Sequence, residues 1–280
     1  MRVLHVVESY GAGTASAVLQ YVRATPDLEH HLVRRLRHDS DHADDGELAE
    51  FASVTEMAAG TPAAVRSVRA AVAAVRPDVV HGHSSFGGAF ARTAVRRGRR
   101  APLLVHTPHC YATERQDLGR LTRAAYAAAE RLLALNTDVV AGCSPRETDL
   151  ARRVAPRARH VFVPNVTDVN VPPDAPATSD LPVVTGMGRL TEQRDPLAFV
   201  ELVRVLRQLG GRPVTARWIG DGRPELAAEL EASGVEVTGW LPRSTALTLL
   251  GESAAYVHTA RWDGAPMTMI EAPSQRAVCT

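Results

Sequence analysis

The sequence predicts an α/β protein with two parallel sheets, because strand and helix patterns alternate along the whole chain. Short apolar runs such as residues 3–7 and 78–83 are typical of strands that are buried on both faces. Parallel strands need crossovers, and helical patterns fill the intervals between these runs. A proline-rich stretch interrupts the alternation, which then starts again. We therefore expect an N-terminal domain at 1–168, a linker at 169–181 and a C-terminal domain at 182–280.

The composition is that of an ordinary globular protein, with 45% hydrophobic and 22% charged residues. A net charge of +1 provides no general attraction for nucleic acid, so we expect no such partner. Basic clusters at 34–38 and 96–100 are either solvated faces or contacts for an anionic membrane surface. Three cysteines without CxxC spacing, and no apolar run long enough to span a bilayer, predict a cytoplasmic protein with reduced thiols, peripheral at most on the inner membrane.

Glycines, prolines and capping residues set the expected boundaries in the first half. Gly11-Ala12-Gly13 precedes a helix over 14–23, an arrangement that suits phosphate but occurs in any tight strand-to-helix turn. Ser144 and Glu147 form a capping-box pattern at the start of a helix over 145–153. The other expectations are strands at 32–33, 102–106, 139–142 and 161–163, helices at 62–75, 89–97 and 118–133, a turn at 84–88 and an irregular loop at 38–46.

The second half repeats the alternation. Strands are expected at 183–187, 214–219, 235–238, 255–258 and 277–279, and helices at 196–208, 224–232, 244–250 and 267–272. Parallel strands end at one edge of their sheet, and open α/β sheets bind ligands beyond that edge. A glycine directly follows three of these predicted strands, namely Gly188, Gly220 and Gly239. This shared edge is the expected binding site.

Two arginines follow the first of these strands. Guanidinium groups hold phosphate oxygens through paired N–H donors, so Arg189 and Arg194 could clamp a diphosphate. In a chain so rich in arginine, both can equally be surface side chains.

Two carboxylates flank the turn before the helix expected at 267–272. Asp263 and Glu271 lie on either side of Gly264 and Pro266. The first N–H groups of such a helix lack partners and attract phosphate. A solvated aspartate and a glutamate at the edge of the core would give the same pattern.

Four histidines, His81, His83, His106 and His109, leave two neighbouring strands. Histidines at such spacings can bind Zn²⁺, but no carboxylate or cysteine pattern nearby completes a recognised ligand set. They can also contact a sugar or act in catalysis, or be ordinary hydrogen-bonded side chains at strand ends. The spacing does not decide among these interpretations.

The order of the motifs resembles the family-4 retaining glycosyltransferases of the GT-B fold, especially those that build bacterial surface polysaccharides. The resemblance covers essentially the whole chain and implies two Rossmann-like domains facing a cleft. Family members continue well beyond the equivalent of Glu271, so we expect an incomplete, C-terminally shortened second domain. The matching motifs are Gly11-Ala12-Gly13, 78–83, His106-Thr107-Pro108-His109, Val163-Pro164-Asn165, Gly188-Arg189-Leu190, Arg194-Asp195-Pro196, Gly220-Asp221-Gly222, Gly239-Trp240-Leu241-Pro242 and 263–271.

The resemblance implies a role for each site residue. Arg189 and Arg194 would hold the donor diphosphate, with Arg194 where the family usually has lysine. Asp263, in place of a glutamate, would contact the donor sugar, His109 would hydrogen-bond that sugar near the reacting carbon, and Glu271 would contact the ribose. The remaining nucleotide-binding positions implied are Gly13, Leu241, Met267 and Thr268.

We therefore expect a retaining glycosyltransferase that moves a hexose from a UDP- or GDP-linked donor to a lipid-linked or polysaccharide acceptor. Arginines and backbone amides would stabilise the leaving diphosphate without a metal or other cofactor. The alternative from another class is a catalytically silent relative that binds nucleotide or a partner enzyme. A hydrolase with histidine-bound zinc is a third interpretation, and metal analysis of purified protein would test it.

Overall fold

A computed structural model describes residues 1–36, 45–96, 98, 100–167, 181–209, 213–274 and 278–279. The chain divides into two compact units, Met1–Val166 (unit 1) and Thr167–Thr280 (unit 2). The expected linker at 169–181 lies outside the described residues except for Leu181, and so do parts of the loop at 38–46, the strand at 277–279 and both basic clusters. Within the described residues, no helix is long and apolar enough to cross a membrane.

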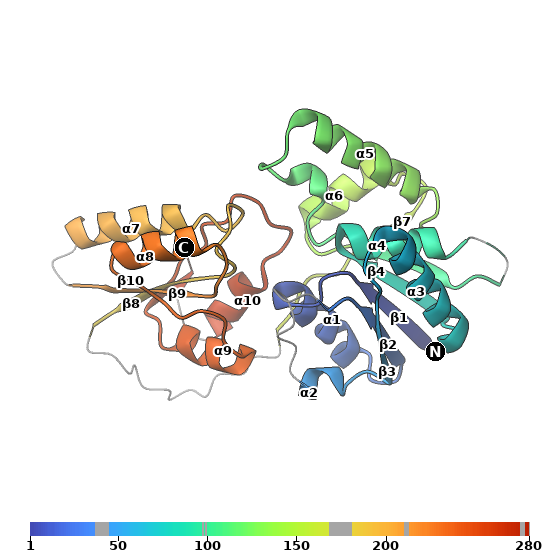
Figure 1. The fold of residues 1–280 in the computed structure, drawn as a ribbon, viewed down its shortest axis with the longest axis horizontal. Coiled ribbons are helices and arrows are strands. Elements are labelled where there is room, and N and C mark those ends of the chain that lie inside the picture. The colour runs from blue at the N-terminus through green and yellow to red at the C-terminus, as the bar shows by residue number, and fades with distance from the viewer. Residues whose placement is uncertain are drawn as a thin grey trace. The chain divides into compact units, whose positions relative to one another are not determined.

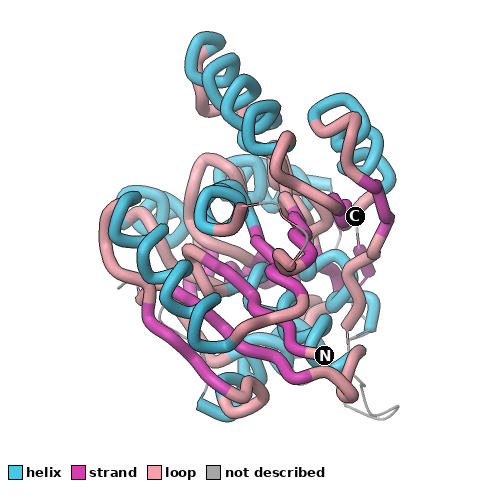
Figure 2. Tube along the Cα trace, turned by 90° about the vertical axis from the view of Figure 1, so that its right-hand side faces the viewer, coloured by secondary structure: helices cyan, strands magenta, loops and turns pink. Residues whose placement is uncertain are grey.

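Unit 1 contains the predicted parallel sheet, in the order β3-β2-β1-β4-β5-β6-β7. Figure 2 shows its strands side by side. The strands are β1 (Arg2–Val7), β2 (Glu29–Arg34), β3 (Ser53–Glu56), β4 (Val79–His83), β5 (Leu103–Thr107), β6 (Val139–Gly142) and β7 (Arg159–Phe162). The helices are α1 (Ala12–Ala24), α2 (Asp45–Leu48), α3 (Thr61–Val75), α4 (Ser84–Ala94), α5 (Arg120–Ala134) and α6 (Pro145–Val154), with a 3₁₀ turn at Ala112–Glu114.

Helices lie on both sides of this sheet (Figure 1), and the side chains of β1 alternate between the two helical layers. Leu4 and Val6 pack in a core with α3 and α4, whereas Val7 packs with α1. Since side chains two positions apart share a face of a strand, His5 points to the side of Val7. A buried histidine therefore lies in the layer between the sheet and α1.

Helix α4 begins directly after β4, so the turn expected at 84–88 is wrong. The helix includes Gly87 and Gly88. A Cβ atom at Gly87 would lie 2.5 Å from the carbonyl oxygen of Val6, and one at Gly88 would lie 2.3 Å from the ring of His106. The glycines allow α4 to approach the sheet closely, and this packing is not visible in a sequence where Gly-Gly indicates a turn.

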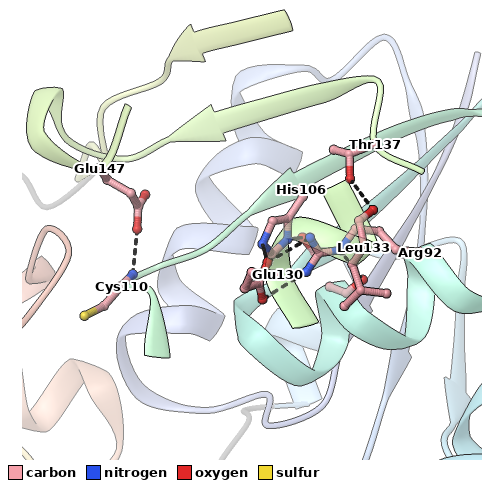
Figure 3. Close-up of polar contacts among 9 residues, drawn as sticks. Arg92, His106, Cys110, Glu130, Leu133, Thr137 and Glu147 are labelled. Carbon is pink, nitrogen blue, oxygen red and sulfur yellow. Dashed lines mark hydrogen bonds and ion pairs between the residues drawn. The ribbon is translucent and has the colours of Figure 1, made fainter. Parts of the chain in front are cut away.

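A buried ion pair connects α4 to α5 (Figure 3). Nη1 and Nη2 of Arg92 donate to the two carboxylate oxygens of Glu130 at 2.9 and 3.2 Å, and Nε donates to the carbonyl oxygen of Gly88 at 3.0 Å. Arg92 and Glu130 are each only 4% exposed. Nδ1 of His106 donates to the carbonyl oxygen of Gly82 at 3.1 Å, and burial holds the pKa of His106 well below its usual value. The Arg92–Glu130 ion pair is thus a charge-assisted contact inside the core.

Unit 2 contains a second parallel sheet, in the order β10-β9-β8-β11-β12. Phe199 and Trp218 form an edge-to-face pair in its core, with ring centroids 5.4 Å apart. Its strands are β8 (Val183–Met187), β9 (Thr215–Ile219), β10 (Val235–Val237), β11 (Ala255–Tyr256) and β12 (Val278–Cys279). Its helices are α7 (Pro196–Leu209), α8 (Pro224–Ala232), α9 (Arg243–Gly251) and α10 (Met267–Ser274).

Candidate active site

Three loops that leave strands of the second sheet meet through their backbones. Isolated bridges pair Leu190 with Gly222, and Gly220 with Gly239. Gly188 and Gly220 have φ angles of 140° and 135°, which residues with a side chain rarely adopt. A Cβ atom at Gly220 would lie 2.3 Å from the carbonyl oxygen of Gly188. The glycine exits identified in the sequence therefore interlock at the carboxyl edge of this sheet.

Arg194 and Asp263 form an ion pair at this edge. Nη1 of Arg194 donates to Oδ2 of Asp263 at 2.5 Å, and both side chains are partly buried. Nε2 of Gln193 donates to the carbonyl oxygen of Trp262 at 3.0 Å, and the hydroxyl of Thr259 donates to the carbonyl oxygen of Arg194 at 2.7 Å. The pair uses one of the five N–H donors of the guanidinium and fixes its direction. Two residues predicted to contact the donor are thus in contact with each other.

Glu271 is buried, with 3% of its surface exposed, and is paired with a residue that sequence reasoning missed. Nη2 of Arg243, the first residue of α9, donates to Oε1 of Glu271 at 2.6 Å. A buried carboxylate needs such a partner, since unpaired burial of charge is costly. One arginine among many carries no recognisable signal, so only the packing of α9 beside α10 identifies Arg243.

The first turn of α10 is held by a hydroxyl network. Tyr256 donates to Oγ1 of Thr268 at 2.6 Å, and its oxygen lies 3.0 Å from Nδ1 of His258. Met267 is buried, and Leu241 packs against the neighbouring apolar cluster. The first N–H groups of a helix have no intrahelical acceptor, so this turn offers donors to an anion.

Two of the predicted site residues lie in unit 1. Gly13 lies in the first turn of α1, because the helix begins at Ala12, two residues earlier than expected. His109 follows β5 and has a φ angle of 50°, and the next residue, Cys110, has a φ angle of 86°. The remaining predicted residues all lie in unit 2, namely Arg189, Arg194, Leu241, Asp263, Met267, Thr268 and Glu271.

Glu147 holds the segment that carries His109. Ser144 caps α6 as predicted, with its hydroxyl oxygen accepting from the N–H of Glu147. The carboxylate of Glu147 does not bond the capping residue but accepts from the N–H groups of Cys110 at 2.6 Å and Cys143 at 2.8 Å, the first shown in Figure 3. Left-handed conformations at two successive non-glycine residues need such support. Glu147, also missed by sequence reasoning as a site residue, therefore positions His109.

Replacement of Glu147 by glutamine is expected to destabilise the protein by about 1–3 kcal/mol, because one of the two buried N–H groups would face an NH₂ group instead of an acceptor. Burial raises the pKa of Glu147, so the folded state binds more protons than the unfolded state above the ordinary glutamate pKa. The contribution of Glu147 to stability therefore falls as pH rises from about 4.5 through its folded pKa.

Urea unfolding of the wild type and the Glu147→Gln variant at a series of pH values measures both effects. The exposed Glu231 on α8 gives the control, since Glu231→Gln should change stability little at any pH. A difference between wild type and Glu147→Gln that does not depend on pH would contradict the burial argument.

The four histidines identified in the sequence do not share one face of the first sheet. His106 pairs in register with Gly82, which lies between His81 and His83, so its side chain points to the opposite face. His5 instead joins His81 and His83 on the side of α1, since His5 is in register with His81. The four histidines therefore do not form one cluster, and the group on the side of α1 includes a residue from the first strand.

Within the described part of the chain, one group of side chains has ligand atoms close enough to share a metal ion. Nitrogen atoms of His5, His81 and His83 all lie within 4.8 Å of one another. Burial lowers the pKa of His81 to about 3 and keeps the pKa values of the other two well below the usual value. Nδ1 of His5 lies 3.1 Å from Nε2 of His83. Tetrahedral ligands of Zn²⁺ would be about 3.4 Å apart, so this contact fits a shared proton better.

Solved structures define the class of the fold. Sucrose-phosphate synthase from Thermosynechococcus elongatus superposes with a TM-score of 0.78 at 16% identity, and Anabaena HepE in complex with UDP and glucose with 0.72 at 16%. WaaG, a glycosyltransferase involved in lipopolysaccharide biosynthesis, superposes with 0.67 at 14%. Each comparison covers 100% of this chain and 80% of the other. These likenesses, with the two parallel sheets, define a GT-B fold.

The family follows from the sequence of unit 1. The family model for the Glycosyl transferase 4-like domain matches residues 12–166, more than half of the chain, so the chain belongs to this family of glycosyltransferases. No curated protein sequence matches the chain. The predicted family-4 GT-B resemblance is therefore confirmed.

Proposed function

We propose that this glycosyltransferase moves a hexose from a UDP- or GDP-linked donor to a lipid-linked or polysaccharide acceptor, with retention of configuration. The observation that carries the proposal is the convergence of the Arg194–Asp263 pair, the buried Glu271 and the start of α10 at the carboxyl edge of the second sheet. Anabaena HepE, which has a similar fold, was solved with UDP and glucose, and this supports a nucleotide-sugar donor. WaaG, also similar in fold, is involved in lipopolysaccharide biosynthesis, and this supports a lipid-linked or polysaccharide acceptor.

Each group at this edge has a chemical task in the proposed reaction. Arg189, Arg194 and the N–H groups of Met267 and Thr268 stabilise the negative charge that develops on the leaving diphosphate. Glu271, held by Arg243, accepts hydrogen bonds from ribose hydroxyls. No metal is needed for this charge stabilisation, because cationic side chains and amides supply it.

The bond changes of the proposed reaction balance without a further reactant. The acceptor oxygen forms a bond to the anomeric carbon on the face from which the diphosphate leaves. The bond between that carbon and the phosphate oxygen breaks, and the proton of the acceptor hydroxyl goes to the leaving phosphate. Asp263 and His109 contact the sugar and orient it during this exchange, in the proposed arrangement. A lipid-linked acceptor would bring the protein to a membrane surface, which basic residues at 34–38 and 96–100 would favour if that surface is anionic.

The first test is a thermal-shift screen with UDP, GDP and nucleotide-sugars, with and without chelator. A ligand that binds only the folded state adds about 2.7 kcal/mol of stability at 100 times its Kd, so Tm must rise. We expect one nucleotide series to raise Tm equally with and without chelator, and Arg189→Ala or Glu271→Ala to abolish the shift. Arg204→Ala on the exposed face of α7 is the control and should leave the shift unchanged.

A folded sample that shows no shift with any nucleotide would contradict the proposed donor site. A shift without release of nucleoside diphosphate in the presence of glycan or lipid-linked acceptors would instead support the silent nucleotide-binding alternative. NMR of the product's anomeric configuration tests retention.

A further inference from the structure

Four histidine rings form a continuous hydrogen-bonded chain in unit 1, from His30 in β2 to His109, two residues after the end of β5. Nδ1 of His30 lies 3.0 Å from Nε2 of His5, and Nδ1 of His5 lies 3.1 Å from Nε2 of His83. Nδ1 of His83 in turn lies 3.1 Å from Nε2 of His109. Each ring nitrogen that faces the next ring does so at hydrogen-bond distance, so one proton occupies each of the three junctions.

Neutral rings make such a chain directional. A neutral imidazole has one N–H donor and one acceptor nitrogen, so a ring that donates at one end must accept at the other. His5, His30 and His83 are at most 5% exposed, and burial lowers the pKa of each of them. If the three rings are neutral, all the N–H groups must point the same way along the chain.

The contact between His30 and Thr25, at one end of the histidine chain, decides which way the N–H groups point. Nε2 of His30 lies 3.2 Å from the carbonyl oxygen of Thr25 and 3.0 Å from its hydroxyl oxygen. A carbonyl oxygen only accepts, and the Thr25 hydroxyl already donates to the carbonyl oxygen of Tyr21 at 2.6 Å. Both oxygens can therefore only accept from His30, which must carry its proton on Nε2.

We propose that this chain fixes His109 as the tautomer with its proton on Nε2, so that Nδ1 carries the lone pair. The N–H donors follow one another from the Thr25 end: His30 donates to Thr25, His5 to His30, His83 to His5, and His109 to His83. Reversal at any junction would place two N–H groups, or two lone pairs, against each other. His30, His5 and His83 are thus positioning residues that act on His109 from within the sheet.

The consequence for ligand recognition rests on the proposed function. In this tautomer Nδ1 of His109 carries a lone pair and no proton, so this atom can accept a hydrogen bond but cannot donate one. A sugar hydroxyl, which can donate, satisfies this nitrogen, whereas a ligand group that can only accept, such as a carbonyl or carboxylate oxygen, does not. The histidine chain therefore favours a hydroxyl-bearing ligand at His109 through three residues that are buried in the protein.

The tautomers can be measured directly by long-range ¹H–¹⁵N NMR of protein labelled at histidine, at neutral pH and without any ligand. The missing signals in His109→Gln and His83→Gln variants assign the two rings. We expect Nε2 to be protonated and Nδ1 unprotonated in His5, His30, His83 and His109. A His109 ring protonated on Nδ1, or on both nitrogens, would overturn the proposal.

A substitution of His30 tests whether the histidine chain causes the tautomer of His109. His30→Phe keeps a ring of similar size but removes the contact to Thr25, and we expect the His109 signals to change to those of a tautomer mixture. His31→Phe is the matched control, because His31 is the next residue of β2, is also buried, and is hydrogen-bonded to Ser53 instead of to the histidine chain. It should leave His109 as in the wild type. An unchanged His109 tautomer in a folded His30→Phe variant would refute the claim that the contact of His30 with Thr25 fixes it.

Metal analysis completes the test, because a bound cation would replace the proton between His5 and His83. One equivalent of zinc that coordinates these rings in the purified protein would overturn the proposal. If His30→Phe does not fold, the wild-type spectrum still decides the tautomer. Failure of every nucleotide to bind would refute the proposed function without changing these spectra, so the two failures are distinguishable.

Discussion

Replacement of Arg92 by methionine is expected to lower the stability of unit 1 by about 3–5 kcal/mol. The substitution keeps the length of the side chain but leaves the Glu130 carboxylate, which is 4% exposed, without its bidentate partner. Loss of the charge also removes the hydrogen bond to the Gly88 carbonyl oxygen, next to the close contact between α4 and the sheet. A buried charge without a partner dominates this cost, since a buried CH₂ group contributes only about 0.8 kcal/mol.

The double variant Arg92→Met/Glu130→Leu is expected to recover most of the lost stability, because an apolar pair of similar volume needs neither desolvated charge nor partner. Urea unfolding followed by far-UV circular dichroism measures both variants. Tryptophan fluorescence reports unit 2, since Trp218, Trp240 and Trp262 all lie there. Arg152→Met removes an exposed i,i+3 pair with Asp149 and should cost less than about 1 kcal/mol. Equal costs for Arg92→Met and Arg152→Met would contradict the burial argument.

Replacement of Arg194 by alanine is expected to lower kcat/KM about 10²–10³-fold with the nucleotide-sugar that the thermal-shift screen identifies. A loss of this size is typical when one hydrogen bond to a developing anion is removed. The variant removes a guanidinium that the structure holds in one direction through Asp263 at 2.5 Å. It also leaves Asp263 without the cation that offsets its charge beside the diphosphate. Steady-state kinetics and direct nucleotide binding measure the two consequences separately.

The split between kcat and KM distinguishes catalysis from simple attraction. If Arg194 stabilises the departing diphosphate, kcat falls more than nucleotide affinity does. Arg194→Lys keeps the charge but loses the planar fork, so it should retain nucleotide affinity better than kcat. Arg204→Ala should match the wild type in both constants. A loss in Arg194→Ala confined to nucleotide affinity would show that this residue binds the ground state and does not contribute to the chemical step.

Sequence patterns predicted most of the elements because burial in a parallel sheet leaves a strong local signal. The run that becomes β1 is apolar at nearly every position, and Pro77 ends α3 where the pattern predicts. β3, by contrast, was not predicted, since all four of its residues are exposed at the edge of the sheet and show no apolar period. The glycines of α4 misled the prediction because their reason lies in β1 and β5, far away in sequence.

The candidate site shows the same division. The order of glycine exits, arginines and carboxylates was sufficient to place Arg194 and Asp263 at one sheet edge, and the structure brings these two into contact. Arg243 and Glu147 had no signal as site residues, because each contacts the site through a residue that is distant in the sequence, Arg243 through Glu271 and Glu147 through the N–H group of Cys110. A single arginine or glutamate becomes recognisable only when its partner is known.

Local periodicity and turn chemistry were enough to predict two parallel α/β sheets and the residues at the strand exits. Which of the histidines meet depends on the packing of the strands. The register of β1 and β4 places His5 beside His81. Because side chains alternate between the two faces of a strand, His106, in register with Gly82, lies on the opposite face. The contact of His30 with Thr25 gives the histidine chain its direction. These are relations between strands, and hydrogen bonding between strands depends on register, which no local pattern in one strand contains.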